Sequence, residues 1–270
     1  MSQEYTAFTG CSYVEGVGLP NTSKNENLWV NLFFNSNNIL SKTKLLNFGC
    51  GGSTNFEIFQ RSVDAMSNYN IRHLFVSWTE IYRYKFSCGL EKYYTNVYWS
   101  LNSPTADISI NPNIVITKKY LANIKNRFFA LHHDHYQILQ ILRFTCSLTQ
   151  LAKKFGTKIY FINSLLPWDK NYFQYINSAT RLPSDTTQYT QKLLNSETRD
   201  NTEFFDIYDQ IHIEYQKSQG LSQCNWLNLD QSYRQSFYMD TGNDNLHPGV
   251  VSNTEFAKYL INYFEQNYKL

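Results

Sequence analysis

Hydrophobic positions along the chain alternate between short runs typical of strands and longer stretches with a helical period. The β-prone runs are residues 6–9, 44–48, 73–76 and 158–162. The segments with apolar residues at helical spacing are 28–33, 56–66, 118–154 and 252–264. Alternating short strands and amphipathic helices indicate an α/β protein with a mostly parallel central sheet. With helices on both faces of that sheet, the expected architecture is a three-layer α/β/α sandwich.

Two of the predicted helices have patterns that specify more than their existence. In residues 56–66, Phe56, Phe59, Val63 and Met66 recur at helical spacing and predict one apolar stripe. The last helix is expected to begin at Ser252 or Asn253, either of which can supply an N-cap. Its predicted apolar face consists of Phe256, Tyr259, Leu260, Tyr263 and Phe264.

Two segments interrupt the alternation. Residues 89–113 have no clear period and contain turn signals, and residues 171–200 are polar and weakly patterned. A chain of 270 residues fits one large domain. We therefore expect a single domain over residues 1–270 with insertions near 89–113 and 171–200, the first of which is a candidate lid.

Composition excludes several classes of protein. The net charge is only +2 and no block of like charge occurs, so neither nucleic acid nor an acidic membrane is an expected partner. No apolar run approaches the length of a membrane-spanning helix, and the first residues lack the features of a secretion signal. The five cysteines are widely spaced and odd in number, which favours reduced thiols and a cytoplasmic location. No oligomeric state is specified by the pattern.

Chemistry-bearing residues follow the first two predicted strands. The first strand runs into Gly10 and Ser12, where a serine hydroxyl can lie above the sheet at the start of a helix. The second runs into a glycine-rich loop that ends at Gly52, whose backbone N–H groups could bind an anion or oxyanion. The alternative for each segment is an ordinary turn followed by a helix cap.

A third cluster precedes the last helix, where Asp244 and His247 stand three residues apart. A carboxylate at that spacing can bind the imidazole Nδ1–H and leave Nε2 free to take a proton from a nucleophile. The alternative is an aspartate that caps the turn and has a histidine beside it.

The order of these clusters resembles that of the SGNH (GDSL-type) hydrolase superfamily, over nearly the whole chain. The opening Gly-Cys-Ser-Tyr-x-x-Gly-x-Gly-Leu is particularly similar to divergent members from phages and marine bacteria. The resemblance implies a flavodoxin-like α/β fold, Ser12 as nucleophile, His247 as general base and Asp244 as its orienting carboxylate. It also implies an oxyanion hole formed by the N–H groups of Ser12 and Gly52, and it implies no cofactor and no metal.

The chain departs from the family pattern at two positions. Cys11 replaces the aspartate that precedes the nucleophile, which leaves the mechanism intact. Thr79 stands where the family has an asparagine whose side chain is an oxyanion donor. A threonine hydroxyl can also donate, but losing one donor outright costs about 10²–10³ in rate. Thr79 is therefore the third expected donor, and slow turnover is one possible outcome.

Other residues admit two interpretations. Trp78, Glu80 and Arg83 are candidates for the substrate groove, or belong to the helix surface and core. The run from His132 to His135 contains three histidines, but their spacing does not match helical metal ligands, so a solvated face is favoured. Cys11 is a formal alternative to Ser12 as nucleophile, although a buried cysteine is normally inert.

The expected function is that of a serine esterase or O-deacylase acting through a covalent acyl-enzyme. A small-molecule or glycan ester is the expected substrate, with a short acyl group on a glycan as the first choice because aromatic residues make up 17% of the chain and suit stacking on sugars. One alternative is a glycan-binding or virion-associated module with weakened catalysis. Another is an O-acyltransferase with the same triad.

Overall fold

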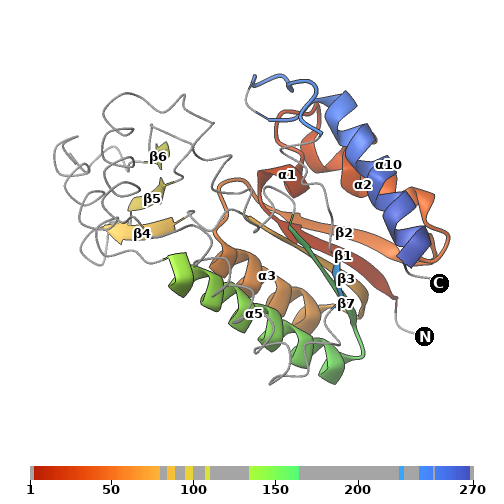
Figure 1. Cartoon of the computed structure of the whole chain (residues 1–270), viewed down its shortest axis with the longest axis horizontal. Coiled ribbons are helices and arrows are strands. Elements are labelled where there is room, and N and C mark those ends of the chain that lie inside the picture. The colour runs from red at the N-terminus through yellow and green to blue at the C-terminus, as the bar shows by residue number, and fades with distance from the viewer. Residues whose placement is uncertain are drawn as a thin grey trace, which may run out of the picture.

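A computed structural model describes residues 3–79, 84–88, 95–99, 107–109, 134–163, 225–227, 237–245 and 247–267. Its main feature is a sheet with the strand order β2-β1-β3-β7-β8, in which all four neighbouring pairs are parallel (Figure 1). The strands are β1 (Tyr5–Gly10), β2 (Lys44–Gly49), β3 (Ile71–Trp78), β7 (Lys158–Asn163) and β8 (Asn225–Leu227). The predicted parallel α/β fold is confirmed, and β8 is a strand that the hydrophobic pattern did not indicate.

Helices cover both faces of this sheet, so the three-layer architecture is also confirmed (Figure 1). The described helices are α1 (Ser12–Glu15), α2 (Trp29–Ser36), α3 (Asn55–Asn68), α5 (Asp134–Phe155) and α10 (Val250–Asn267), with 3₁₀ turns at Thr22–Lys24 and Leu40–Lys42. α2 and α10 lie on one face of the sheet, and α3 and α5 lie on the other. No helix in the described part of the chain has the length and apolar character needed to cross a membrane.

Alternation along the strands builds one hydrophobic core on each face of the sheet. Phe8 and Phe75 stack at 4.7 Å between ring centroids in the core beneath α2 and α10. Leu74 and Val76, the neighbours of Phe75 along β3, belong to the core beneath α3 and α5. Each fully buried side chain of this size contributes roughly 1.5–3 kcal/mol. The carboxyl ends of β1, β2 and β3 are thereby held at one edge of a rigid scaffold.

α3 begins with a capping box formed by Thr54 and Glu57, as its sequence favours. Of its predicted apolar stripe, Met66 is buried and Phe59 and Val63 pack against the core, but Phe56 does not. Phe56 is 52% exposed, so its expected place in an apolar stripe facing the core is wrong. The buried side is centred on Ile58 and Ser62, and Phe56 lies about 200° around the helix from Ile58. Burial of Ser62 leaves its hydroxyl satisfied, because it accepts a hydrogen bond from the Thr9 hydroxyl and donates one to the Ile58 carbonyl, both at 2.8 Å.

α10 begins at Val250, so the predicted caps Ser252 and Asn253 lie inside its first turn, and the predicted cap is wrong. The capping group comes from the preceding loop. The Asp240 carboxylate accepts the backbone N–H of Val251 at 3.0 Å and that of Ser252 at 2.8 Å. A carboxylate ten residues upstream can reach the helix only because the loop folds back on itself, which a sequence pattern cannot indicate.

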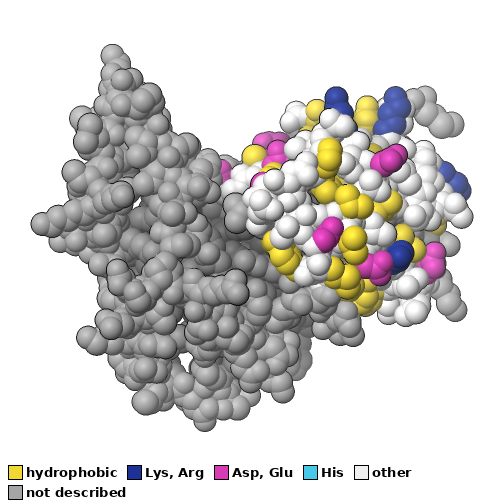
Figure 2. All heavy atoms as spheres, turned by 90° about the horizontal axis from the view of Figure 1, so that it is seen from above, with side chains coloured by type: hydrophobic (Ala, Val, Ile, Leu, Met, Phe, Trp, Pro, Cys, Tyr) yellow, Lys and Arg dark blue, Asp and Glu magenta, His cyan; other side chains and the backbone are white. Residues whose placement is uncertain are grey.

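The two predicted insertions are only partly visible. The structure describes a small antiparallel sheet of β4 (Tyr84–Cys88), β5 (Thr95–Trp99) and β6 (Asp107–Ser109), two strands of which fall within residues 89–113. The segment 171–200 lies outside the described residues. On the face seen in Figure 2, acidic, basic and hydrophobic side chains are interspersed over the described surface, in keeping with the small net charge.

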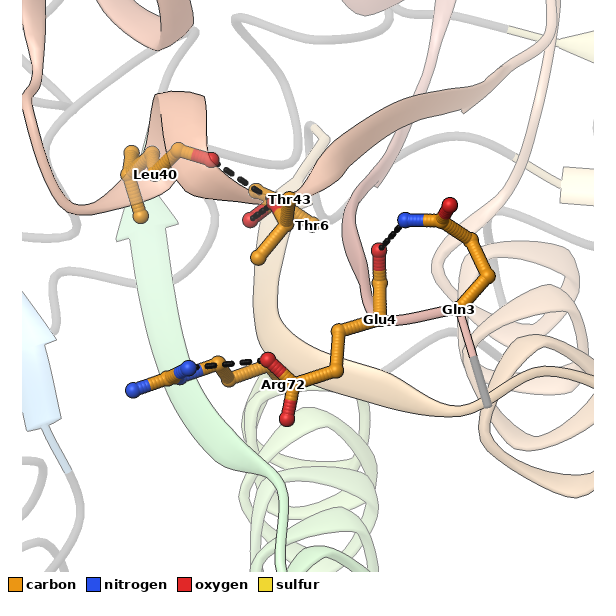
Figure 3. Close-up of polar contacts among 6 residues, drawn as sticks. All are labelled: Gln3, Glu4, Thr6, Leu40, Thr43 and Arg72. Atoms are coloured by element: carbon orange, nitrogen blue, oxygen red, sulfur yellow. Dashed lines mark hydrogen bonds and ion pairs between the residues drawn. The ribbon is translucent and has the colours of Figure 1, made fainter. Parts of the chain in front are cut away.

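Side-chain bonds hold the amino edge of the sheet together (Figure 3). The Thr43 hydroxyl donates to the Leu40 carbonyl at 2.7 Å, so the Thr6 hydroxyl must be the donor in the 2.7 Å bond between the two threonines. Arg72 of β3 forms an ion pair with Glu4 at 2.8 Å. These contacts join β1 to both neighbouring strands at the edge opposite the candidate site.

Candidate active site

Ser12 directly follows the turn at the carboxyl end of β1. Cys11 is the residue before α1, and Ser12 is the first residue of that helix and only 3% exposed. A side chain at Gly10 would collide with Val14, so the strand can turn this tightly only with glycine there. Because α1 is a single turn, its helix dipole contributes little to the electrostatics at Ser12. Cys11 is fully buried, as expected of an inert thiol.

The glycine loop after β2 packs directly against this turn. A Cβ at Gly49 would collide with the backbone of Glu15, so glycine is required for the close approach of the two segments. The Glu15 carboxylate accepts the Gly51 N–H at 2.5 Å, and the ideal Cβ position of Gly51 lies 3.9 Å from Ser12 Cβ. Gly52 adopts a φ of +71°, in the left-handed region. The structure therefore brings Ser12 and the glycine loop together.

Two long polar side chains fasten the loop and the turn to each other. Asn47 of β2 donates to the Val14 carbonyl at 2.7 Å. Arg61 of α3 donates to the Gly10 carbonyl at 3.2 Å and to the Ser53 hydroxyl at 2.5 Å. The positions of the Ser12 turn and the glycine loop are thus set jointly by β1, β2 and α3.

Asp244 and His247 form the pair that their spacing predicted. His247 Nδ1 lies 2.6 Å from Asp244 Oδ2, and the His247 backbone N–H donates to Asp244 Oδ1 at 3.0 Å. The side chains are 23% and 32% exposed for His247 and Asp244, respectively. A carboxylate on Nδ1 favours the tautomer with the proton on that nitrogen, which leaves Nε2 as a proton acceptor.

The pair lies against the residues that flank Ser12. A Cβ added to Gly18 would lie 3.0 Å from His247 Cβ and 3.1 Å from Asp244 Oδ1. The Asn243 N–H donates to the Gly18 carbonyl at 2.8 Å. The ring of Tyr13, the neighbour of Ser12, meets the His247 ring edge-on with centroids 5.8 Å apart. Segments more than 220 residues apart in the chain therefore meet at one edge of the sheet.

The loop that carries the pair is closed at its base. Gly242 N–H donates to the His247 carbonyl at 2.7 Å, and Gly249 N–H donates to the Asp240 carbonyl at 3.1 Å. Burial raises the pKa of Asp240, but hydrogen bonds from Ser252 and Val251 outweigh burial and leave that pKa below its ordinary value. Asp240 is thus held ionised as the cap of α10, and the loop starts from a fixed point.

The three donors expected from the sequence are all without acceptors in the described part of the chain. Neither the Ser12 N–H nor the Gly52 N–H has a hydrogen-bond acceptor there. The Thr79 hydroxyl is buried and likewise has no partner among the described residues. Ser12 and Thr79 are buried, and buried donors are nearly always paired in folded proteins, so these two exceptions call for an explanation such as a ligand.

Thr79 is positioned by Asn55. The Asn55 side chain accepts the Thr79 N–H at 2.8 Å and donates to the Thr79 carbonyl at 3.2 Å. Both residues are buried, with 7% of Asn55 and 1% of Thr79 exposed. The carboxyl end of β3 is thereby attached to the first turn of α3.

Of the remaining predicted residues, the structure describes Trp78 and places it outside the site. Trp78 is 1% exposed and stacks on Phe161 in the core beneath α3 and α5, which favours the core interpretation over the substrate groove. Glu80 and Arg83 lie outside the described residues, as do the histidines at 132 and 133. The residues that sequence reasoning missed are Glu15, Asn55, Arg61 and Asp240, which act on backbone groups distant in the chain and leave no local motif.

The fold and this edge of the sheet define an α/β protein in which a serine turn, a glycine loop and an Asp–His pair adjoin one another. No family model matches the sequence, and no curated protein matches it. Solved structures that the chain resembles include TesA (10% identity, 98% of this chain and 99% of the other, TM-score 0.47). The esterase EstA from Pseudoalteromonas sp. gives 12% identity, 98% of each chain and a TM-score of 0.46. The acetylxylan esterase Axe2 from Geobacillus stearothermophilus gives 9% identity, 97% of this chain, 94% of the other and a TM-score of 0.44.

All three similarities lie below 25% sequence identity and below a TM-score of 0.5. At such identities and TM-scores they carry no conclusion about the activity of this chain, which has to rest on its own residues.

Proposed function

We propose that the protein is a serine ester hydrolase whose nucleophile is Ser12, whose general base is His247 and whose orienting carboxylate is Asp244. The observation that carries the proposal is the 2.6 Å Asp244–His247 bond in a loop packed against the residues that flank Ser12. An aspartate that merely capped its turn would need only the backbone bond from His247, whereas here the carboxylate also binds the imidazole.

In the acylation step, Ser12 Oγ attacks the ester carbonyl carbon while His247 Nε2 takes the hydroxyl proton. The carbonyl oxygen becomes an oxyanion, which the N–H groups of Ser12 and Gly52 and the Thr79 hydroxyl would bind. The ester C–O bond then breaks, and the proton on His247 passes to the departing alcohol. Asp244 holds the imidazole in orientation and stabilises its transient positive charge.

Deacylation runs through the same groups. His247 Nε2 removes a proton from water, and the hydroxide attacks the carbonyl carbon of the acyl-Ser12 ester. A second oxyanion forms in the same site, and its collapse returns the proton to Ser12 Oγ and releases the acid. No group beyond these side chains and backbone amides is needed for the proton and charge balance.

Three unpaired donors support this assignment. The Ser12 N–H, the Gly52 N–H and the Thr79 hydroxyl are the groups that an oxyanion would use, and each lacks an acceptor in the described part of the chain. The Gly51 N–H, in contrast, is already bound by Glu15, so Gly52 is the better donor of the two. Preorganised donors of this kind typically supply the largest electrostatic contribution to acyl transfer.

Labelling with a fluorophosphonate tests the nucleophile. Wild type and Cys11→Ala should be labelled, and Ser12→Ala should not, because only Ser12 would form the covalent adduct. Labelling of Ser12→Ala to the level of wild type, or no labelling of folded wild type, would refute the assignment. Loss of labelling in Cys11→Ala alone, with a folded variant, would point to the thiol instead.

The substrate class that we propose first is a short acyl ester, with an acetyl group on a sugar as the leading case. Hydrolysis of p-nitrophenyl acetate and of a panel of acetylated sugars measures it, and acyl transfer to added sugar acceptors identifies a transferase. Glycan binding without serine-dependent turnover on any ester would support the alternative, a module that keeps the fold and has weak catalysis.

A further inference from the structure

Asn55 is buried, and its side chain holds the backbone of another residue in place. Both of its amide functions bind the backbone of one residue, Thr79, with the Oδ1 bond at 2.8 Å and the Nδ2 bond at 3.2 Å. This pair of bonds restrains the Thr79 backbone as the hydrogen bonds between neighbouring strands restrain a residue within a sheet. Thr79 needs such a restraint because β3 ends one residue earlier, at Trp78.

The two bonds from Asn55 go to the Thr79 backbone and leave its side chain unbound in the described part of the chain. Its hydroxyl is buried and has no partner there, which costs roughly 1–3 kcal/mol. A β-branched side chain has few χ1 states, so fixing its backbone also fixes its hydroxyl. A hydroxyl that is held in place and is unpaired can donate a hydrogen bond to an acceptor atom of a ligand.

The strand register puts Thr79 at the same edge as the nucleophile. Thr9 of β1 pairs with Val76 of β3, and an ideal Cβ at Gly10 would lie 3.1 Å from Ser77 Cβ. Ser12 lies two residues after Gly10, and Thr79 lies two residues after Ser77. Asn55 itself lies three residues after Gly52, so the side chain that holds Thr79 belongs to the segment that carries the second donor.

We infer that Asn55 is a positioning residue that sets the spacing of the oxyanion donors Gly52 and Thr79. It acts through the Thr79 backbone and does not contact the reacting atoms. This inference rests on the proposed serine hydrolase function. It also explains how a threonine can serve where related sequences have a longer asparagine: the shorter side chain depends on a fixed backbone to bring its hydroxyl to the oxyanion.

Steady-state kinetics with p-nitrophenyl acetate test the inference. Asn55→Ala should lower kcat about 10–100-fold and change KM little, because the lost interaction serves the transition state. Asn55→Asp keeps the side-chain volume and the bond from the Thr79 N–H. It should also lower kcat, because its second oxygen would face the Thr79 carbonyl. Amide hydrogen exchange at Thr79 should accelerate in Asn55→Ala.

A double-mutant cycle separates positioning from general destabilisation. Thr79→Val removes the hydroxyl and should lower kcat about 100-fold, and adding Asn55→Ala to it should change kcat little further. Thr79→Ser retains a hydroxyl and should retain most of the activity. The control is Asn31→Ala, which removes a similarly buried asparagine bound to the Ser23 and Asn25 carbonyls, and which should lower stability and leave kcat unchanged.

The inference fails if folded Asn55→Ala keeps wild-type kcat, or if the two substitutions act additively. Ser12→Ala distinguishes this failure from failure of the proposed function. An inactive Ser12→Ala beside a fully active Asn55→Ala removes only the role of Asn55. An active Ser12→Ala removes the hydrolase proposal itself.

Discussion

The Glu15 carboxylate accepts the backbone N–H of Gly51 at 2.5 Å and so joins the helix that begins with Ser12 to the glycine loop. Glu15 is three residues after Ser12, so one turn of helix carries both the proposed nucleophile and the group that fixes the neighbouring loop. The bond is charge-assisted, which makes it stronger than an ordinary backbone hydrogen bond.

Removing this carboxylate should loosen the glycine loop. We expect Glu15→Ala to lower kcat for p-nitrophenyl acetate about ten-fold, because Gly52 loses its fixed distance from Ser12. Glu15→Gln retains an acceptor for Gly51 and should lose less. Glu255→Ala, which removes a surface partner of Lys258, serves as control and should keep wild-type kcat. Equal activity of the alanine and glutamine variants would show that the hydrogen bond is not the important contact.

Substitution of Gly18 should displace the Asp–His pair. Gly18→Ala combines a φ of +91° with a Cβ close to His247 and Asp244, so activity and stability should both fall. Gly16→Ala is the matched control, because Gly16 has a φ of +88° but its Cβ would meet Thr22 and Leu28. Thermal midpoints should fall in both variants. The loss of kcat that follows from displacing Asp244 and His247 should occur only in Gly18→Ala. Similar kcat in the two variants would contradict this.

Asp240 should contribute stability that depends on pH. Its pKa is lowered in the folded protein, so the ionised form is preferred there, and the contribution is present above the unfolded pKa and lost as pH falls through the folded value. We expect Asp240→Asn to lower the free energy of unfolding by about 1–2 kcal/mol at pH 7, and the difference from wild type to shrink on acidification.

Urea denaturation over a range of pH measures this effect. Asp64→Asn, at an exposed position of α3, provides the control and should follow the wild-type pH dependence. If the free energies of unfolding of wild type and Asp240→Asn differ by the same amount at every pH, down to the pH of acid denaturation, the cap does not depend on ionisation.

His73 should destabilise the fold in mild acid. The ring is buried, both of its nitrogens lack partners in the described part of the chain, and it stacks on Tyr160 at 6.2 Å. Burial, followed by the positive charges of Lys158 and Arg72, lowers the pKa of His73 from 6.5 to about 4. The unfolded chain therefore takes up a proton before the folded one does, and stability falls as pH drops from about 6.5 towards 4, by up to about 3 kcal/mol.

His73→Phe keeps a ring on Tyr160 and has no group to protonate. Its free energy of unfolding should fall less than that of wild type between pH 6.5 and 4, while the comparison at pH 7.5 reports packing alone. His73→Leu repeats the test without the stack. Parallel pH profiles for wild type and both variants would mean that His73 is protonated in the fold without cost.

Regular elements could be predicted from the sequence because their signals are local. The run from Thr6 to Gly10 contains both the strand and the residue that ends it, and Asp244 and His247 stand close enough in sequence to predict their bond. The apolar period around Phe56 predicted the helix correctly, and Met66, Phe59 and Val63 of its stripe do belong to or pack against the core, but Phe56 itself is exposed. Ser62 occupies the core there, where its hydroxyl accepts a hydrogen bond from the Thr9 hydroxyl of β1, and a contact between residues 53 positions apart is not a local signal.

By itself, the sequence determined the parallel α/β architecture and the three segments that carry the proposed chemistry, since strand and helix periods, glycines and the Asp-x-x-His spacing act over a few residues. Only the tertiary structure decided what holds those segments in place. Glu15 on Gly51, Asn55 on Thr79 and Asp240 on α10 are side-chain bonds to backbone groups. Every residue other than proline has the same backbone N–H and C=O groups, so the partner in such a bond depends on the path of the chain through space and not on the local order of side chains.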